Sequence, residues 1–222
     1  MSIPDDIFTE PTDVSPDTLA HLGPLARLAG VWEGQGGVDI NPKADGPERK
    51  VFSERTVFQP IDAQANGPQL FYGLRYHTHI TTDEELITLH DQVGYWLWEP
   101  ATGLITQSLA IPRGQVAMAS GHAKPGDDVL ILSAERGRTD YGICSTTFLE
   151  EAFRTDRYSL TLTFNADGSL TYVAETQLAV HGQPGLFNHR DENTLRRVAG
   201  PQPSPWQQRL KNQAGTSPAK AD

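Results

Sequence analysis

The stretch LARLAGVWEGQGG, Leu25–Gly37, decides the fold. Its apolar residues lead into a set at alternate positions, which are Gly30, Trp32, Gly34 and Gly36. A period of two is the spacing of a β-strand. Because glycine in a strand gives up side-chain packing, three at this spacing indicate that another backbone, a ring or a ligand approaches one face closely. The stretch therefore predicts a tightly curved first barrel strand, with Trp32 filling the base of the interior.

The composition limits the classes of function. The chain has 222 residues and a formal net charge of −10, which is enough length for one sizeable domain. Nucleic acids and anionic membranes select clustered Lys and Arg, so this acidic balance argues against both as partners. The single cysteine, Cys144, cannot form an intramolecular disulfide and is expected to be a small buried residue. No basic and apolar leader precedes the domain, and no stretch reaches about 18 apolar residues, which predicts a cytoplasmic protein.

Beyond its first strand the chain repeats short strands and turns. The clearest pair is Tyr158–Phe164 and Leu170–Leu178, where apolar and polar residues alternate on both sides of the turn Asn165–Gly168. Further strands are expected at Val51–Pro60, Leu70–Thr81, Glu85–Trp98, Leu104–Ile111, Gln115–Ser120 and Val129–Ala134. About ten short antiparallel strands with no long helix predict an all-β fold, a single closed antiparallel β-barrel preceded by a short helical turn.

The pattern is weaker at the ends and in one internal segment. Residues 1–14 are acidic and proline-containing and are expected to form a disordered arm. Residues 15–199 make up the barrel domain, and residues 200–222, rich in Pro, Gln, Ala and Lys, are expected to form a disordered tail. Within the domain, Thr147–Phe153 is interpreted as either a strand or a loop.

Several segments in the same order resemble one family. Gly30–Gly36, GVWEGQG, has the form GxWxGxG, which resembles the nitrobindin family of heme-binding β-barrels, calycin-type relatives of fatty-acid-binding proteins. Phe71–Tyr76 is similar to the aromatic strand that follows in that family. Leu89–Trp96 resembles its His-x-x-x-Gly-aromatic-aromatic strand, and Ala110–Val116 its small-x-x-x-Gly segment. Pro184–Val198 looks like its last strand, which carries the histidine that coordinates heme iron.

The resemblance spans roughly residues 25–198 and implies a ten-stranded barrel with heme b at one mouth. It implies a protein that binds nitric oxide, isomerises peroxynitrite to nitrate, or does both at the ferric heme. By the resemblance, His189 is the axial ligand of the iron and His90 is the catalytic histidine of the pocket. The residues expected around the ring are Trp32, Gly34, Gly36 and Tyr95.

The two histidines have simpler interpretations as well. His189 lies six residues before Leu195, one more than in the usual motif. A shift of one residue turns a strand side chain to the other face unless a bulge absorbs it, so the spacing predicts either a bulge or an outward His189. In the outward case, His189 would be a loop-end histidine bonded to Asp191 or to a backbone carbonyl. For His90, in a strand beside Asp91, the simpler interpretation is a side chain that only packs.

Two other functions remain open on the sequence. One is a non-catalytic carrier, monomer or homodimer, that holds a fatty acid or another small apolar ligand in the barrel without heme. An Arg-lined interior with His189 outside would favour the carrier, whereas an inward His189 would favour heme; Arg113 is either a cap for a ligand carboxylate or a solvent-facing turn residue. The other is a cupin-like metal site, which requires His77 and His79, with Glu84 in reach, to converge on His189.

Overall fold

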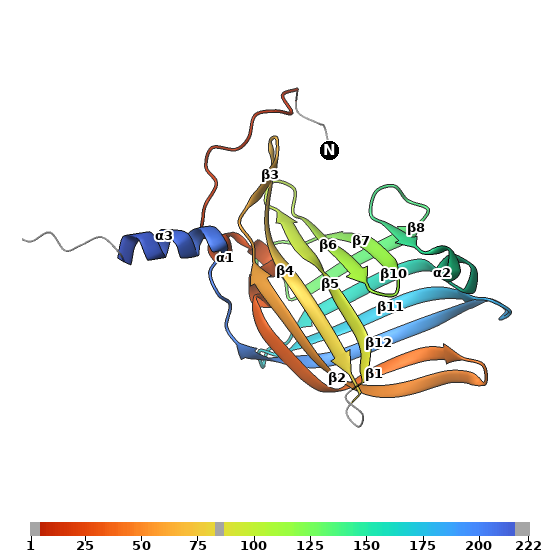
Figure 1. Ribbon diagram of the computed structural model, residues 1–222. Coiled ribbons are helices and arrows are strands. Elements are labelled where there is room, and N and C mark those ends of the chain that lie inside the picture. The colour runs from red at the N-terminus through yellow and green to blue at the C-terminus, as the bar shows by residue number, and fades with distance from the viewer. Residues whose placement is uncertain (1–4, 83–86, 216–222) are drawn as a thin grey trace, which may run out of the picture.

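The strands follow one another around a ring. A computed structural model describes residues 5–82 and 87–215 of the protein, and Figure 1 shows how the elements are arranged. The strands of the described residues are β1 (Gly30–Lys43), β2 (Gly46–Pro60), β3 (Gln64–Asn66), β4 (Gln69–Thr81), β5 (Thr88–Glu99), β6 (Leu104–Ile111), β7 (Gln115–His122), β8 (Val129–Arg136), β9 (Gly142–Ser145), β10 (Phe153–Phe164), β11 (Leu170–Val180) and β12 (Leu186–Ala199). The helices are α1 (Thr18–His21), the 3-10 helix η1 (Gly23–Leu28), α2 (Thr147–Ala152) and α3 (Pro205–Gly215).

Antiparallel pairing closes the ring. β1 pairs with β2 on one side and with β12 on the other, and β2 in turn pairs with β4. From β4 the sheet continues through β5, β6, β7, β8, β10 and β11 back to β12. The short strands β3 and β9 join this ring, with β9 lying between β7 and β8. The prediction of a closed all-β barrel of about ten strands is confirmed, and the start of the strand expected from Glu85 lies outside the described residues.

One end of the barrel is closed by the helical segment that precedes β1. Leu22, Leu25 and Leu28 of this segment are fully buried and belong to the same core as Trp32. The indole nitrogen of Trp32 donates a hydrogen bond to the carbonyl oxygen of Leu28 at 2.7 Å, which ties the segment to the strand. The expectation of short helical turns that lead into the first strand is therefore correct, and Trp32 does fill the base of the interior.

The segment expected to be a disordered tail differs from that expectation. Residues Pro205–Gly215 form α3, which lies beside α1 in Figure 1. The hydroxyl of Ser204 donates to the carbonyl oxygen of Pro16 at 3.0 Å, and the backbone N–H of Trp206 donates to a carboxylate oxygen of Asp62 at 2.6 Å. These contacts with residues far away in sequence fix the start of α3, and the local composition does not predict them.

The glycines of the opening stretch form a bulge in β1. The register of β1 against β2 shifts between Gly34 and Gly37, and Gly36 lies in the left-handed region with φ +78°. One extra residue in a strand reverses the alternation of its side chains, and glycine in the left-handed conformation is the usual residue for this geometry. Before the bulge the even-numbered Trp32 and Gly34 face inward, and after it the odd-numbered Gly37 and Asp39 do.

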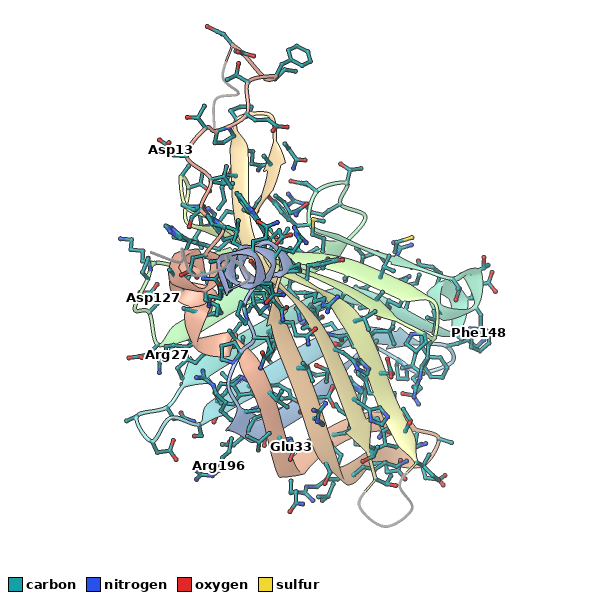
Figure 2. All side chains as sticks on the ribbon, turned by 60° about the vertical axis from the view of Figure 1, so that its left-hand side comes forward. Asp13, Arg27, Glu33, Asp127, Phe148 and Arg196 are labelled. Atoms are coloured by element: carbon teal, nitrogen blue, oxygen red, sulfur yellow. The ribbon has the colours of Figure 1, made fainter. Side chains whose placement is uncertain are left out.

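The close approaches predicted at Gly30, Gly34 and Gly36 are present at the first two. A Cβ atom on Gly30 would lie 2.6 Å from the carbonyl oxygen of Ala199, and one on Gly34 would lie 2.5 Å from a methyl carbon of Leu195, whereas one on Gly36 would meet no atom within 4 Å. Figure 2 shows Glu33 and Arg196, the neighbours of Gly34 and Leu195 in sequence, projecting from the outer surface. The inner row of β1 is therefore pressed against neighbouring side chains, as the sequence predicted.

Two expectations for the segment before β10 are corrected. Thr147–Ala152, interpreted as a strand or a loop, is the helix α2, whose Phe148 is 68% exposed and lies at the periphery in Figure 2. Cys144, expected to be buried, is exposed in β9 because its side chain alternates outward on this short strand. Among the described residues, no helix has the length and apolar character needed to cross a bilayer.

Candidate functional site

The end of the barrel opposite η1 contains a cavity of about 560 Å³. Sites for small molecules are commonly about 300–1,000 Å³. Its wall includes the inward rows of β1, β2, β5 and β12, and its charged and polar members include Asp39, Glu54, His90, Gln92, His189 and Asp191. The interior is thus apolar at the closed end and strongly polar at the open end.

His189 faces the cavity from a regular strand. The pairing of β11 with β12 runs without a shift from Leu170 opposite Leu195 to Ala179 opposite Leu186, so no bulge lies between His189 and Leu195. Six residues is an even separation, and the two side chains therefore share the inner face. The prediction that an inward His189 needs a bulge was wrong; a loop-end position is likewise excluded, because His189 is within β12.

Two carboxylates surround the imidazole of His189. Its Nε2 atom makes a hydrogen bond of 2.9 Å with Asp191 and lies 3.6 Å from Oδ1 of Asp39. Burial by itself would lower the pKa of His189, but the hydrogen bond with Asp191 and the charges of Asp191 and Asp39 outweigh it and raise that pKa. Burial and the charge of Asp191 raise the pKa of Asp39. The three groups form one electrostatic unit on the cavity wall.

His90 lines the cavity from β5. Its Nε2 atom is 3.2 Å from the side-chain oxygen of Gln92, and burial lowers its pKa, so the neutral imidazole is favoured. Arg113 follows β6 at the mouth of the cavity and donates to the carbonyl oxygen of Leu89 at 2.7 Å. Arg113, His90 and His189 line the same cavity, and the positive charge of Arg113 opposes protonation of both imidazoles.

A buried carboxyl group lies in the wall below the histidines. Glu54 of β2 is 6% exposed and accepts hydrogen bonds from the hydroxyls of Tyr172 and Thr56, each at 2.8 Å, and from the amide of Asn193 at 3.3 Å. Burial raises its pKa, and these three donors oppose the increase. The hydrogen bonds hold the carboxyl oxygens in fixed positions.

A second polar network crosses the barrel at a similar depth. The hydroxyl of Tyr76 accepts hydrogen bonds from the amides of Gln92 and Gln107, and the hydroxyl of Tyr158 donates to Gln107 at 3.1 Å. His90 is joined to this network through Gln92. Together with Glu54, these groups form a polar part of the cavity wall, beside apolar core residues such as Trp96, Leu162 and Leu195 that also line the cavity.

Glu54→Gln is expected to flatten the pH dependence of stability. Because folding raises the pKa of Glu54, the folded state binds this proton more tightly than the unfolded state does. Its contribution therefore favours folding below the ordinary carboxyl pKa and is lost as the pH rises through the folded-state value. Denaturant unfolding from about pH 4 to pH 8 should show a smaller fall in the free energy of unfolding for Glu54→Gln than for wild type. Glu151→Gln, at an exposed position of α2, is the control, and parallel curves for all three proteins would contradict the prediction.

Several residues expected around a ligand lie elsewhere. Tyr95 is 48% exposed on the outer face of β5, because the inward residue of that pair is Trp96. Trp32 belongs to the closed-end core, Gly34 packs on Leu195, and Gly36 borders open space at the bulge. None of these four belongs to the described lining of the cavity.

The cupin-like metal site is also contradicted. His77 and His79 point outward from β4, where they make hydrogen bonds with Asp91 and Thr88 at 3.1 and 2.9 Å. His189 is on the inner face of a different strand, so the three imidazoles do not converge, and Glu84 lies outside the described residues.

Sequence reasoning missed two carboxyl groups of the site, Asp39 and Glu54. The sequence does contain a signal for Glu54. It belongs to the alternating row Phe52, Glu54, Thr56 and Phe58, in which the three remaining residues are apolar or small. The sequence contains no such signal for Asp39, because its inward orientation depends on the bulge at Gly36 and its approach to Asp191 depends on strand register.

Comparison with known proteins gives matches of two kinds. The sequence model of the THAP4-like, heme-binding β-barrel domain matches residues 21–197. Among solved structures, the crystal structure of Rv2717c from M. tuberculosis is similar, with 26% sequence identity and a TM-score of 0.56. That match covers 83% of this chain and 99% of the other. No curated protein matches the chain.

Proposed function

The chain belongs to the family of THAP4-like, heme-binding β-barrel domains, and we propose that its cavity binds heme b with His189 as an axial ligand of the iron. The observation that carries this proposal is an inward imidazole with one ring nitrogen held by the carboxylate of Asp191. Metal-ligating histidines typically donate one ring N–H to such a partner, which orients the ring and increases the basicity of the other nitrogen. His90 lacks this feature, because its partner is the neutral amide of Gln92.

The other side chains at the mouth also fit a heme. Porphyrin has two apolar faces and carries two propionates on one edge. The cavity wall near the mouth includes apolar residues for the faces and basic residues for the propionates. The apolar ones are Leu89, Ile111, Leu149, Phe153 and Leu178, and the basic ones are Lys43, Lys50 and Arg113.

The reaction we propose involves reactive nitrogen species. Bound heme iron would supply the position at which nitric oxide binds and peroxynitrite rearranges to nitrate, a reaction that neither adds nor removes atoms. Arg113, whose guanidinium lines the cavity, attracts the anionic substrate toward the cavity mouth. His90, held by Gln92, contacts the bound anion from its own wall of the barrel.

The carrier function is less well supported by the same geometry. An outward His189 was expected for a heme-free carrier, and His189 faces inward. A long alkyl chain would also lie against the carboxyl group of Glu54 and the amides of Gln92 and Gln107, polar groups with which it makes no hydrogen bond.

The direct test is a titration of the heme-free full chain with hemin, followed by absorption spectroscopy. We expect a Soret band that saturates at one heme per chain. An increase that stays linear with added hemin, as in nonspecific adsorption, would contradict heme binding. In that case, displacement of a fluorescent fatty acid from the cavity would test the carrier instead.

His90→Ala is expected to retain heme and to slow the decay of peroxynitrite about tenfold, the loss expected when one hydrogen bond to a charged group is removed. Stopped-flow absorption of peroxynitrite in the presence of the heme-loaded protein measures this rate. His122→Ala, at an exposed position at the far end of β7, is the matched control. Equal rates for His90→Ala and the control would remove His90 from the reaction while leaving heme binding intact.

A further inference from the structure

Three side chains of neighbouring strands bring potential metal ligands together on the cavity wall. Asp39 of β1 lies directly opposite Asp191 of β12, and His189 is the next inward residue along β12. One atom from each side chain, two carboxylate oxygens and one imidazole nitrogen, lie within 4.8 Å of one another. Three ligands at such separations are the number and kind that a protein commonly gives to a metal ion in an open site.

The cluster carries an imbalance of charge. Two carboxylates face a single imidazole, because Asp39 lies opposite Asp191 across the two strands. The Oδ1 atom of Asp39 is buried and has no hydrogen-bond partner among the described residues, whereas its Oδ2 accepts from the amide of Asn41 at 2.9 Å. The nearest ring nitrogen, Nε2 of His189, is 3.6 Å from Oδ1, beyond hydrogen-bonding distance. A buried, unpartnered carboxylate oxygen facing a second carboxylate indicates a place for a cation.

We propose that Asp39, His189 and Asp191 form a mononuclear site for a divalent first-row transition metal ion. Carboxylate oxygens with one imidazole suit manganese, iron or zinc. With three protein ligands, further coordination positions stay open toward the cavity, where Arg113 and His90 lie. An anionic ligand that enters the cavity could bind the ion and meet the guanidinium.

This site and the proposed heme use the same imidazole, so the two occupants exclude each other. The metal proposal does not depend on heme binding, because it rests on the two carboxylates as well as on His189. A substitution of Asp39 distinguishes the two proposals, because Asp39 is a ligand in the metal site and does not hold the iron in the heme proposal. The cavity would then bind either heme or a single metal ion.

The test is a titration of the heme-free full chain with Co²⁺, followed by its visible absorption, and with Zn²⁺ by calorimetry. We expect one ion per chain for wild type. Asp39→Asn keeps the shape of the side chain but removes a charged ligand, so it should weaken binding by at least the roughly 10- to 100-fold that loss of an outer partner causes. Glu33→Gln, on the outer face of the same strand, is the matched control and should bind like wild type.

Hemin titrations of the same proteins distinguish the two proposals. Saturating Zn²⁺ should weaken hemin uptake by wild type, while Asp39→Asn should take up hemin whether or not zinc is present. Metal binding that Asp39→Asn leaves unchanged would mean an adventitious surface site and would overturn the metal proposal. If wild type takes up hemin but binds neither Co²⁺ nor Zn²⁺, the metal proposal is overturned and the heme proposal stands. If wild type binds these ions but takes up no hemin, the heme proposal is overturned and the metal proposal stands. Thermal unfolding of each variant verifies that it is folded.

Discussion

His189→Ala is expected to abolish saturable heme binding. The substitution removes the imidazole that we propose as the axial ligand and leaves Asp191 facing a void. No second imidazole replaces it, since His90 lies on another wall and is bonded to Gln92. Loss of a metal–ligand bond should reduce hemin affinity by at least about a hundredfold, as compared with the 10- to 100-fold effect of losing only an outer partner. The Soret band of the hemin titration measures it.

His77→Ala is the matched control for this substitution. His77 is a strand histidine bonded to a carboxylate, as His189 is, but it lies on the outer face of the barrel. We expect wild-type hemin affinity for His77→Ala. If His189→Ala and His77→Ala bound hemin equally well, the axial ligand would have to be another group, and the proposed heme geometry would be wrong.

Gly94→Ala is expected to destabilise the barrel wall strongly. An added Cβ would lie 1.9 Å from the backbone carbonyl oxygen of Ser108 on β6, a separation that no real Cβ adopts. Because the obstacle is backbone and not the end of a flexible side chain, β5 and β6 must move apart where Gly94 is paired with Leu109. Overpacking of this kind costs about 3 kcal/mol. The midpoint of denaturant unfolding should fall accordingly.

Gly200→Ala controls for the general effect of replacing a glycine. Its added Cβ would meet no atom within 4 Å, and its backbone is outside the left-handed region. We expect its unfolding midpoint to remain within experimental error of wild type or to rise slightly, since alanine restricts the unfolded chain. Similar midpoints for Gly94→Ala and Gly200→Ala would show that β5 and β6 separate at little cost.

The fold could be predicted because its signals are local. Alternation in Tyr158–Phe164 and Leu170–Leu178, with a turn between them, determines a hairpin without reference to the rest of the chain. The two helices that were missed have no comparable local pattern. The start of α3 is fixed by Asp62 and Pro16, and α2 packs against β10 with no buried residue of its own to reveal it.

The candidate site could be predicted only where one strand defines it. His189 was identified by resemblance, and its even separation from Leu195 determines their shared face. His189 and Asp39 are 150 residues apart in sequence and come together because β12 pairs with β1. Neither this pairing nor its register can be predicted from the sequence alone. For the same reason Tyr95 was placed beside the ligand although its strand turns it outward.

The bulge at Gly36 has a consequence for how barrels of this kind diverge. Beyond Gly36 the odd-numbered residues of β1 face the cavity only because the bulge adds one residue to the strand. In a regular strand of the same length, Val38 and Ile40 would face inward and Asp39 would face solvent. Loss of Gly36 together with the bulge would leave Gly37 opposite Phe52 and Asp39 opposite Lys50, so the charged wall would be kept. A homologous barrel can therefore lack this one residue, which an alignment records as a gap, and still present the same row of side chains to its ligand.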